Sequence, residues 1–147
     1  MGILAELLNT KVNYILVRDD EDTYTEKAMI NGRMILFTAE YAWIKSIDEP
    51  SWEVAFMERA NKHDNFTTRI TGSGGELQVF SFVRDALARY LKSHDPDAFH
   101  FSASDSEPSR IKLYGSLASR FKNSKYTASV LDYAGSRYWC YNSTLTI

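Results

Sequence analysis

Four segments in the first sixty residues alternate apolar and polar side chains, which is the period-two pattern of half-buried β-strands. Asn31 and Gly32 separate the second segment from the third. Asn-Gly is the strongest short-range hairpin signal, because both central residues of a type I′ turn need positive φ. An acidic stretch, residues 19–22, separates the first two segments and predicts a solvated turn. We therefore expect antiparallel strands over residues 12–18, 23–30, 33–43 and 52–59.

The second half of the chain changes to helical spacing. Apolar residues recur three and four positions apart over residues 76–94, which predicts the longest helix. Pro96 ends that helix, and a short apolar strand is expected over residues 98–103. Ser106 is the expected N-cap of a second helix over residues 107–121. Two closing strands are expected over residues 126–131 and 137–141.

This order of elements predicts an α/β (α+β) fold. A strand, a helix and another strand in succession imply a parallel crossover, whereas the hairpins of the first half imply antiparallel neighbours. Together they predict a mixed sheet with helices on its faces. The length of 147 residues favours one domain over residues 1–147, and a content of 44% apolar residues is enough for its core.

Charge and cysteine content narrow the class of protein. The chain has 17 basic and 19 acidic residues, so it lacks the basic surplus expected of a nucleic-acid-binding protein. Its single cysteine, Cys140, rules out an internal disulfide and favours a reducing compartment. No apolar run reaches the roughly 18–20 residues that cross a bilayer, and the N-terminus lacks the basic region of a secretory signal. We therefore expect a cytoplasmic protein with no membrane partner.

A glycine-rich loop, Arg-Ile-Thr-Gly-Ser-Gly-Gly over residues 69–75, leads into the longest helix. Glycine lets the backbone approach a ligand closely, and backbone N–H groups at the head of a helix can bind an anion. Arg69 could pair with a phosphate through its planar guanidinium. The alternative is a flexible connection with Arg69 as a surface cation.

This loop and the elements around it resemble the GNAT superfamily of acyl-CoA-dependent N-acyltransferases. The pyrophosphate loop of that family is commonly Gln/Arg-x-x-Gly-x-Gly/Ala, and residues 69–74 fit this pattern. After the next strand the family often shows Asn-x-x-Ala-x-x-Leu-Tyr. Leu113 and Tyr114 match the end of that motif, whereas Glu107 and Arg110 replace its Asn and Ala. The same stretch also looks like a group of small bacteriophage proteins.

The resemblance implies a GNAT-like mixed, mainly antiparallel sheet of six or seven strands with helices on both faces. It implies that Tyr114 protonates the departing thiolate, and that Glu53 or Glu58 is the general base for an unknown amine acceptor. It also implies acetyl-CoA or another acyl-CoA as cofactor. The residues that would hold its pyrophosphate are Arg69, Gly72, Ser73, Gly74 and Gly75.

Other polar residues have more ordinary interpretations. His100 lies on the short apolar strand, where a hydrogen-bonded core histidine is expected rather than a catalyst. Glu107 and Arg110 are spaced to pair across one helical turn, and the alternative is that Arg110 faces a cleft. Cys140 lies between aromatic residues and is expected to be buried.

Two departures from the family pattern favour a second function. Polar residues 61–68 separate the predicted fourth strand from the loop, and Glu76 places a negative charge at the head of the helix. The alternative is therefore a non-catalytic protein that binds a host or phage protein, with Trp139 and Tyr141 as exposed anchors. If phage-encoded, it would act in the host cytoplasm, and a symmetric oligomer would favour an assembly component. An open slot beside the loop favours acyl transfer, and a filled slot favours docking.

Overall fold

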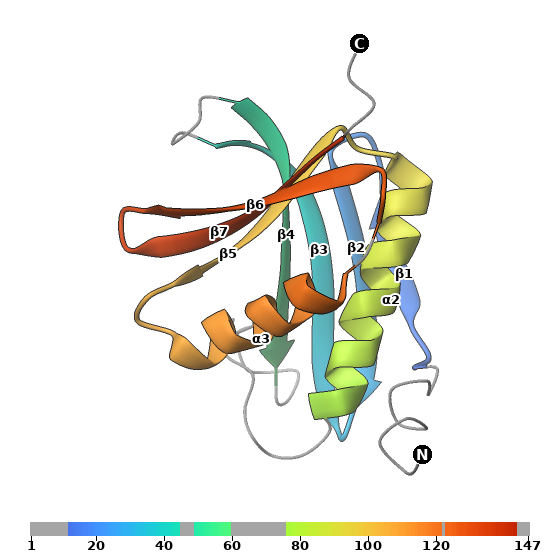
Figure 1. The fold of residues 1–147 in the computed structure, drawn as a ribbon. Helices are drawn as coiled ribbons and strands as arrows, with labels where there is room; N and C mark the ends of the chain where they lie inside the picture. Colours follow the sequence, from blue (N-terminus) through green and yellow to red (C-terminus); the bar gives the residue numbers. More distant parts are fainter. Residues whose placement is uncertain (1–11, 45–48, 60–75, 122, 144–147) are drawn as a thin grey trace.

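The computed structural model of the chain describes residues 12–44, 49–59, 76–121 and 123–143, which form one sheet and two helices (Figure 1). The helices are α2 (Glu76–His94) and α3 (Pro108–Arg120). The strands are β1 (Ile15–Asp19), β2 (Thr23–Ile30), β3 (Arg33–Ile44), β4 (Glu49–Arg59), β5 (Ala98–Ser104), β6 (Tyr126–Tyr133) and β7 (Ser136–Ser143).

The sheet is mixed and mainly antiparallel, as expected. Its strand order is β1-β2-β3-β4-β5-β7-β6, so all seven described strands belong to one sheet. Only β4 and β5 pair in parallel, through the crossover that contains α2. Every other neighbouring pair is antiparallel. The fold class and the order of elements predicted from the sequence are therefore confirmed.

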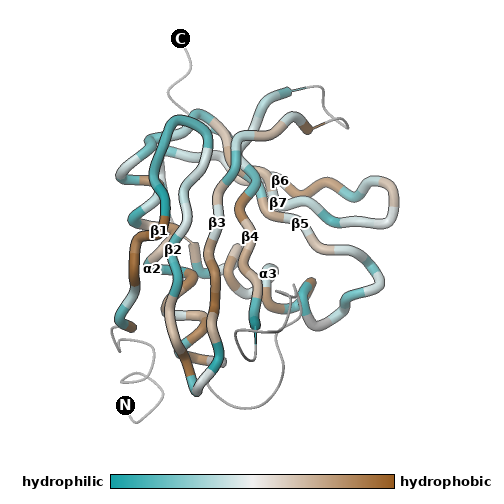
Figure 2. The backbone as a smooth tube through the Cα atoms, turned by 180° about the vertical axis from the view of Figure 1, so that it is seen from behind, coloured by the Kyte–Doolittle hydropathy of each residue, from teal (hydrophilic) through white to brown (hydrophobic). Residues whose placement is uncertain are grey.

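Both described helices cover the same face of the sheet. Alternation along β4 places Trp52 and Phe56 on one side. The ring of Trp52 lies 5.4 Å from that of Tyr90 on α2, and the ring of Phe56 lies 5.1 Å from that of Tyr114 on α3. Figure 1 shows both helices in front of the strands, and Figure 2 shows the strands from behind. The two described helices therefore lie on one face of the sheet, whereas the sequence predicted helices on both faces.

The core lies between this face and the two helices, and it is rich in aromatic residues. Phe99 stacks on Tyr141 with ring centroids 4.7 Å apart, and both side chains are buried. Burying one such side chain contributes roughly 1.5–3 kcal/mol. The largest fully buried phenylalanines are Phe37, Phe56, Phe82, Phe99 and Phe101.

Turn chemistry sets most of the element boundaries. Asn31 and Gly32 have φ of 52° and 73°, which confirms the predicted hairpin between β2 and β3. The predicted bounds of the long helix, residues 76–94, are confirmed. The helix ends before Asp95, which has φ of 46° and is followed by Pro96. Gly135, with φ of 79°, lies at the turn between β6 and β7.

Three local expectations are wrong. β4 begins at Glu49 and contains Pro50, since β3 extends to pair with it there. The N-cap of α3 is Glu107, which makes no capping bond through its side chain; Ser106 instead contacts the hydroxyl of Ser104 at 2.8 Å. The proposed exposed anchors on β7 are in fact buried: Trp139 is 6% exposed and Tyr141 is 3% exposed, because both pack into the core beneath α3.

A buried ion pair joins α2 to β2. The carboxylate of Glu26 is fully buried and accepts two hydrogen bonds from Arg89, at 2.9 and 2.7 Å. It also accepts a hydrogen bond from the hydroxyl of Tyr24. The guanidinium of Arg89 lies 3.6 Å from the ring centroid of Tyr14. A buried carboxylate is tolerated only when it is paired in this way.

We expect Arg89→Ala to lower the free energy of unfolding by about 3 kcal/mol, because it leaves the carboxylate of Glu26 buried without its cation. Urea titration followed by circular dichroism measures this loss. Arg137→Ala is the matched control, since Arg137 pairs with Asp132 at 2.9 Å on the surface, where the pair is solvated. Equal losses in the two variants would contradict a structural role for the buried pair.

Candidate functional site

The parallel contact between β4 and β5 is very short. Only Trp52 with Phe99 and Glu53 with His100 are in register, whereas β3 and β4 stay paired along their whole length. The two strands separate toward their C-terminal ends, so the last residues of β4 have no strand partner on the β5 side. We call this gap the splay. A backbone carbonyl in such a gap needs another hydrogen-bond donor.

Arg110 of α3 supplies that donor. Its side chain is only 7% exposed, and its Nη2 lies 2.8 Å from the backbone oxygen of Phe56 and 3.0 Å from the hydroxyl oxygen of Tyr114. The expected pairing with Glu107 is present at 3.9 Å but is longer than these contacts. Arg110 therefore faces the gap between the strands, and its shorter contacts there are with the chain itself.

Tyr114 lies at the base of the splay. Its side chain is 1% exposed, and its ring centroid lies 5.0 Å from that of Phe101 and 5.9 Å from that of Trp139. Burial raises the pKa of the phenol, and the neighbouring Arg110 acts in the opposite direction. The hydroxyl accepts its bond from Arg110, so its own proton can be donated to another group.

The two candidate bases lie on opposite faces of β4. Glu58 shares the face of Phe56, is buried, and has its carboxylate 3.6 Å from the guanidinium of Arg33. Glu53 is exposed on the other face, beside His100 of β5. The structure thus brings Tyr114 and Glu58 to the helical face of the sheet and leaves Glu53 on the opposite face.

The cofactor-binding residues predicted from the sequence, Arg69 and the stretch from Gly72 to Gly75, lie outside the described residues, as does the polar segment 61–68. Between β4 and the two helices the side chains are closely packed, and a cavity of about 10 Å³ is left there. It is lined by Phe56, Val79, Phe80, Val83, Leu113 and Leu117.

His100 and Cys140 are both buried, as expected. The Nδ1 atom of His100 lies 2.9 Å from the hydroxyl oxygen of Ser51, and burial lowers the pKa of the imidazole to about 4. Burial raises the pKa of the Cys140 thiol. Both groups are therefore neutral near pH 7, and they do not form the thiolate–imidazolium pair of a cysteine nucleophile.

No family model and no curated protein matches the sequence. Among solved structures, the crystal structure of the GNAT domain of S. lividans PAT aligns with a TM-score of 0.47 and 16% sequence identity. The alignment covers 82% of this chain and 61% of that chain. At this identity and score the likeness supports no statement about a site or an activity.

Neither α2 nor α3 is long and apolar enough to cross a membrane. Within the described ranges, no three His, Cys, Asp or Glu side chains are grouped so that they could hold a metal ion.

The hydrogen bond from Arg110 to the hydroxyl of Tyr114 was not predicted from the sequence. A spacing of four residues on a helix brings two side chains together, so the pair was detectable from the sequence. The contact with the carbonyl of Phe56 was not detectable, because it depends on where β5 leaves β4.

We expect the stability of the protein to fall in mild acid because of His100. The pKa of its imidazole is about 4 in the folded protein, compared with a reference value of 6.5. Between these two pH values the unfolded chain therefore binds a proton that the folded protein does not. The free energy of unfolding should be constant from this source above pH 6.5 and should decrease by roughly 3 kcal/mol as the pH falls to 4.

Chemical denaturation at a series of pH values measures the decrease. His100→Asn is the comparison, because the amide keeps a polar partner for Ser51 but does not titrate. The difference between the two curves isolates the histidine from the carboxylates. Parallel curves for the two proteins would refute this assignment.

Proposed function

We propose that the protein transfers an acyl group from acetyl-CoA or another acyl-CoA to an amine. The observation that supports this most is the splay: a parallel strand pair that separates after two residues in register, beside a buried tyrosine on the following helix. The loop at residues 69–75 supports it independently, because its sequence fits the pyrophosphate pattern of the GNAT superfamily.

In this proposal each residue has a defined role. The backbone N–H groups of residues 72–75 and the guanidinium of Arg69 bind the pyrophosphate at the head of α2. Tyr114 donates its proton to the departing thiolate, while the amine attacks the thioester carbonyl directly. Glu53 or Glu58 removes the proton of the amine. Glu58 must exchange its contact with Arg33 for one with the acceptor, whereas Glu53 is accessible to solvent.

The contacts of Arg110 bear on whether an acyl-CoA fits the splay. Its guanidinium already donates a hydrogen bond to the carbonyl of Phe56. In the proposed binding mode, an amide of the cofactor needs a backbone acceptor in this part of the splay. The cofactor arm must therefore displace Arg110 or pass beyond the packed residues at the end of the splay. Because the chain itself supplies the hydrogen-bond donor in the splay, the described residues fit an acyl-CoA only in part.

This same contact favours the second candidate, a non-catalytic protein that binds another protein. Because Arg110 donates a hydrogen bond to the carbonyl of Phe56, no ligand is needed in the splay to satisfy that carbonyl. Anchors other than Trp139 and Tyr141 would then be needed, and the exposed aromatic residues Tyr41, Trp43 and Tyr133 supply them. The resemblance to bacteriophage proteins stays a prediction for this candidate.

We expect acetyl-CoA to bind saturably in calorimetry, and Gly74→Asp to abolish binding, because it adds a side chain and a negative charge in the pyrophosphate loop. Ser129→Asp is the control, because it adds the same charge at an exposed position of β6. Arg110→Ala separates the two candidates: stronger binding by this variant would mean that Arg110 competes with the cofactor. A failure of both the wild type and Arg110→Ala to bind millimolar acetyl-CoA or longer acyl-CoAs would eliminate the transferase.

We expect Tyr114→Phe to reduce turnover by about 100-fold, the contribution of one positioned general acid, with the KM for acyl-CoA nearly unchanged. Release of free thiol in the presence of a panel of amines measures the rate. Tyr133→Phe is the control, because Tyr133 is exposed. Unaltered turnover in Tyr114→Phe would show that another group protonates the thiolate.

A further inference from the structure

A groove of about 440 Å³ lies between α2 and the residues that follow α3. Figure 1 shows the end of α3 beside α2. Among the described residues that line the groove, four are basic and one, Asp95, is acidic. The whole chain has a formal net charge of −2, so this excess of cations is a local feature. The basic residues are Arg84 and Lys92 of α2, Arg120 at the end of α3, and Lys125.

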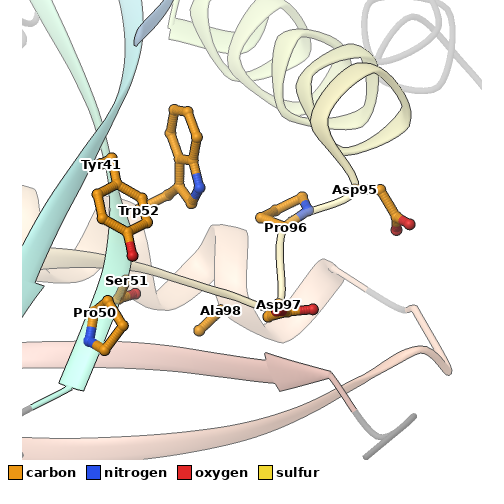
Figure 3. A pocket seen from close by; sticks show the side chains of 8 residues that line it. All are labelled: Tyr41, Pro50, Ser51, Trp52, Asp95, Pro96, Asp97 and Ala98. Atoms are coloured by element: carbon orange, nitrogen blue, oxygen red, sulfur yellow. The ribbon is translucent and has the colours of Figure 1, made fainter. Parts of the chain in front are cut away.

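Two of the four cations are paired with carboxylates of the protein itself. Arg84 lies 3.1 Å from Asp85, and Lys125 forms an ion pair with Asp95. Asp95 also lines a second cavity, of about 240 Å³, which lies beside Trp52 between the start of β4 and the chain that leaves α2 (Figure 3). Figure 3 shows the carboxylate of Asp95 directed away from Trp52. These carboxylates offset only part of the positive charge of the groove.

Lys92 and Arg120 are the two cations without a carboxylate partner among the described residues. Both are exposed, and one comes from each helix. The guanidinium of Arg120 lies 5.3 Å from the ring centroid of Phe80. That contact holds the guanidinium over the ring and leaves its N–H groups available to an acceptor.

Helix dipoles explain part of this arrangement. Lys92 and Arg120 each lie in the last turn of a helix, where the partial negative charge of the helix end favours a cation. That effect acts within a single turn and does not require the two helix ends to share a groove. Arg84 lies in the middle of α2, so its position on the same groove has no such cause. The excess of cations therefore favours an anionic ligand.

Apolar side chains line the rest of the groove. Leu91 and Tyr126 are each 8% exposed, and Phe121 is half-buried. The ring of Phe121 lies 5.9 Å from that of Phe99 and 5.3 Å from that of Tyr141, so this part of the groove is continuous with the core. A surface that is packed before a ligand arrives lowers the entropic cost of binding.

We propose that this groove binds a small phosphomonoester with an apolar carbon part. A phosphomonoester carries a charge of about −1.5 to −2 at pH 7, which matches two cations better than a single carboxylate does. Its oxygens accept hydrogen bonds from Lys92 and Arg120, and its carbon part lies against Leu91 and Phe121. The volume of the groove falls within the roughly 300–1,000 Å³ of small-molecule sites, which leaves room for more than a phosphate group.

This site is distinct from the pyrophosphate loop of the proposed transferase. α2 has 19 residues, so at a rise of 1.5 Å per residue it is about 28 Å long. The loop directly precedes its first residue, whereas Lys92 lies in its last turn. One phosphate group cannot occupy both positions. The inference goes beyond acyl transfer and does not depend on it.

Phenyl phosphate is a suitable probe, with phenol and inorganic phosphate as its two halves. Nuclear magnetic resonance of ¹⁵N-labelled protein reports on the backbone amides that border the groove. We expect phenyl phosphate to shift the amide signals of Ala88, Leu91 and Asn123 saturably. It should bind about fivefold more tightly than either half, because each half makes only one of the two kinds of contact.

Lys92→Gln and Arg120→Gln should each weaken the binding of phenyl phosphate about threefold to fivefold, because each removes one exposed cationic partner. Lys112→Gln is the matched control, since Lys112 is an exposed lysine of α3 that does not line the groove. Asp95→Asn should tighten binding about twofold, because it removes the opposing charge. Asparagine also tolerates the φ of 46° at this position.

Gly74→Asp, in the pyrophosphate loop, should leave the binding of phenyl phosphate unchanged. Loss of binding in that variant would place the phosphate in the loop and overturn the inference. The absence of any shift at high millimolar phenyl phosphate would overturn it as well, as would equal effects of Lys92→Gln and Lys112→Gln. A phosphotyrosine peptide that binds more than about tenfold more tightly than phenyl phosphate would replace the small molecule with a protein partner.

Discussion

The feature on which the rest of the structure depends is the brevity of the parallel contact between β4 and β5. Two residue pairs hold the β1–β4 half of the sheet to the β5–β7 half, so the edge of β4 that faces β5 has no described strand partner on either side of that contact. Unpaired backbone groups must be satisfied by side chains, water or ligands. On the C-terminal side Arg110 satisfies the carbonyl of Phe56, and on the N-terminal side a cavity lies open beside Trp52.

Buried polar groups connect the β1–β4 half of the sheet to the two helices. Glu26 and Arg89 connect β2 to α2, and Arg110 connects β4 to α3. Each of these bonds spans more than fifty residues of sequence. A bond of this kind in a low-dielectric core is costly to leave half-made, because the remaining partner loses its solvation. The helices are therefore positioned by specific polar contacts as well as by the packing of aromatic rings.

Local chemistry made much of the fold predictable from the sequence. The Asn-Gly turn, the helical spacing over residues 76–94 and Pro96 act within a few residues, and each set its element as expected. Interpretations that needed contacts between distant segments were less successful. The burial of Trp139 depends on α3, so its sequence neighbours do not reveal it. The sequence predicts that the fourth strand starts at Trp52, because only the pairing with β3 shows that it starts at Glu49. The cavity beside Trp52 could not be predicted, because its two walls are more than forty residues apart.

Arg110 stands where the motif that the chain resembles has alanine, and its long side chain reaches the carbonyl of Phe56. Alanine at this position would leave the carbonyl of Phe56 without this donor, and a ligand could then bind there. With arginine, the chain contributes the donor and a charge to the splay. A hydrogen bond from a charged group contributes about 1.5–3 kcal/mol, so a ligand that displaces it must regain a comparable amount elsewhere. The proposed binding of an acyl-CoA in the splay therefore requires other contacts of the cofactor to supply that compensation.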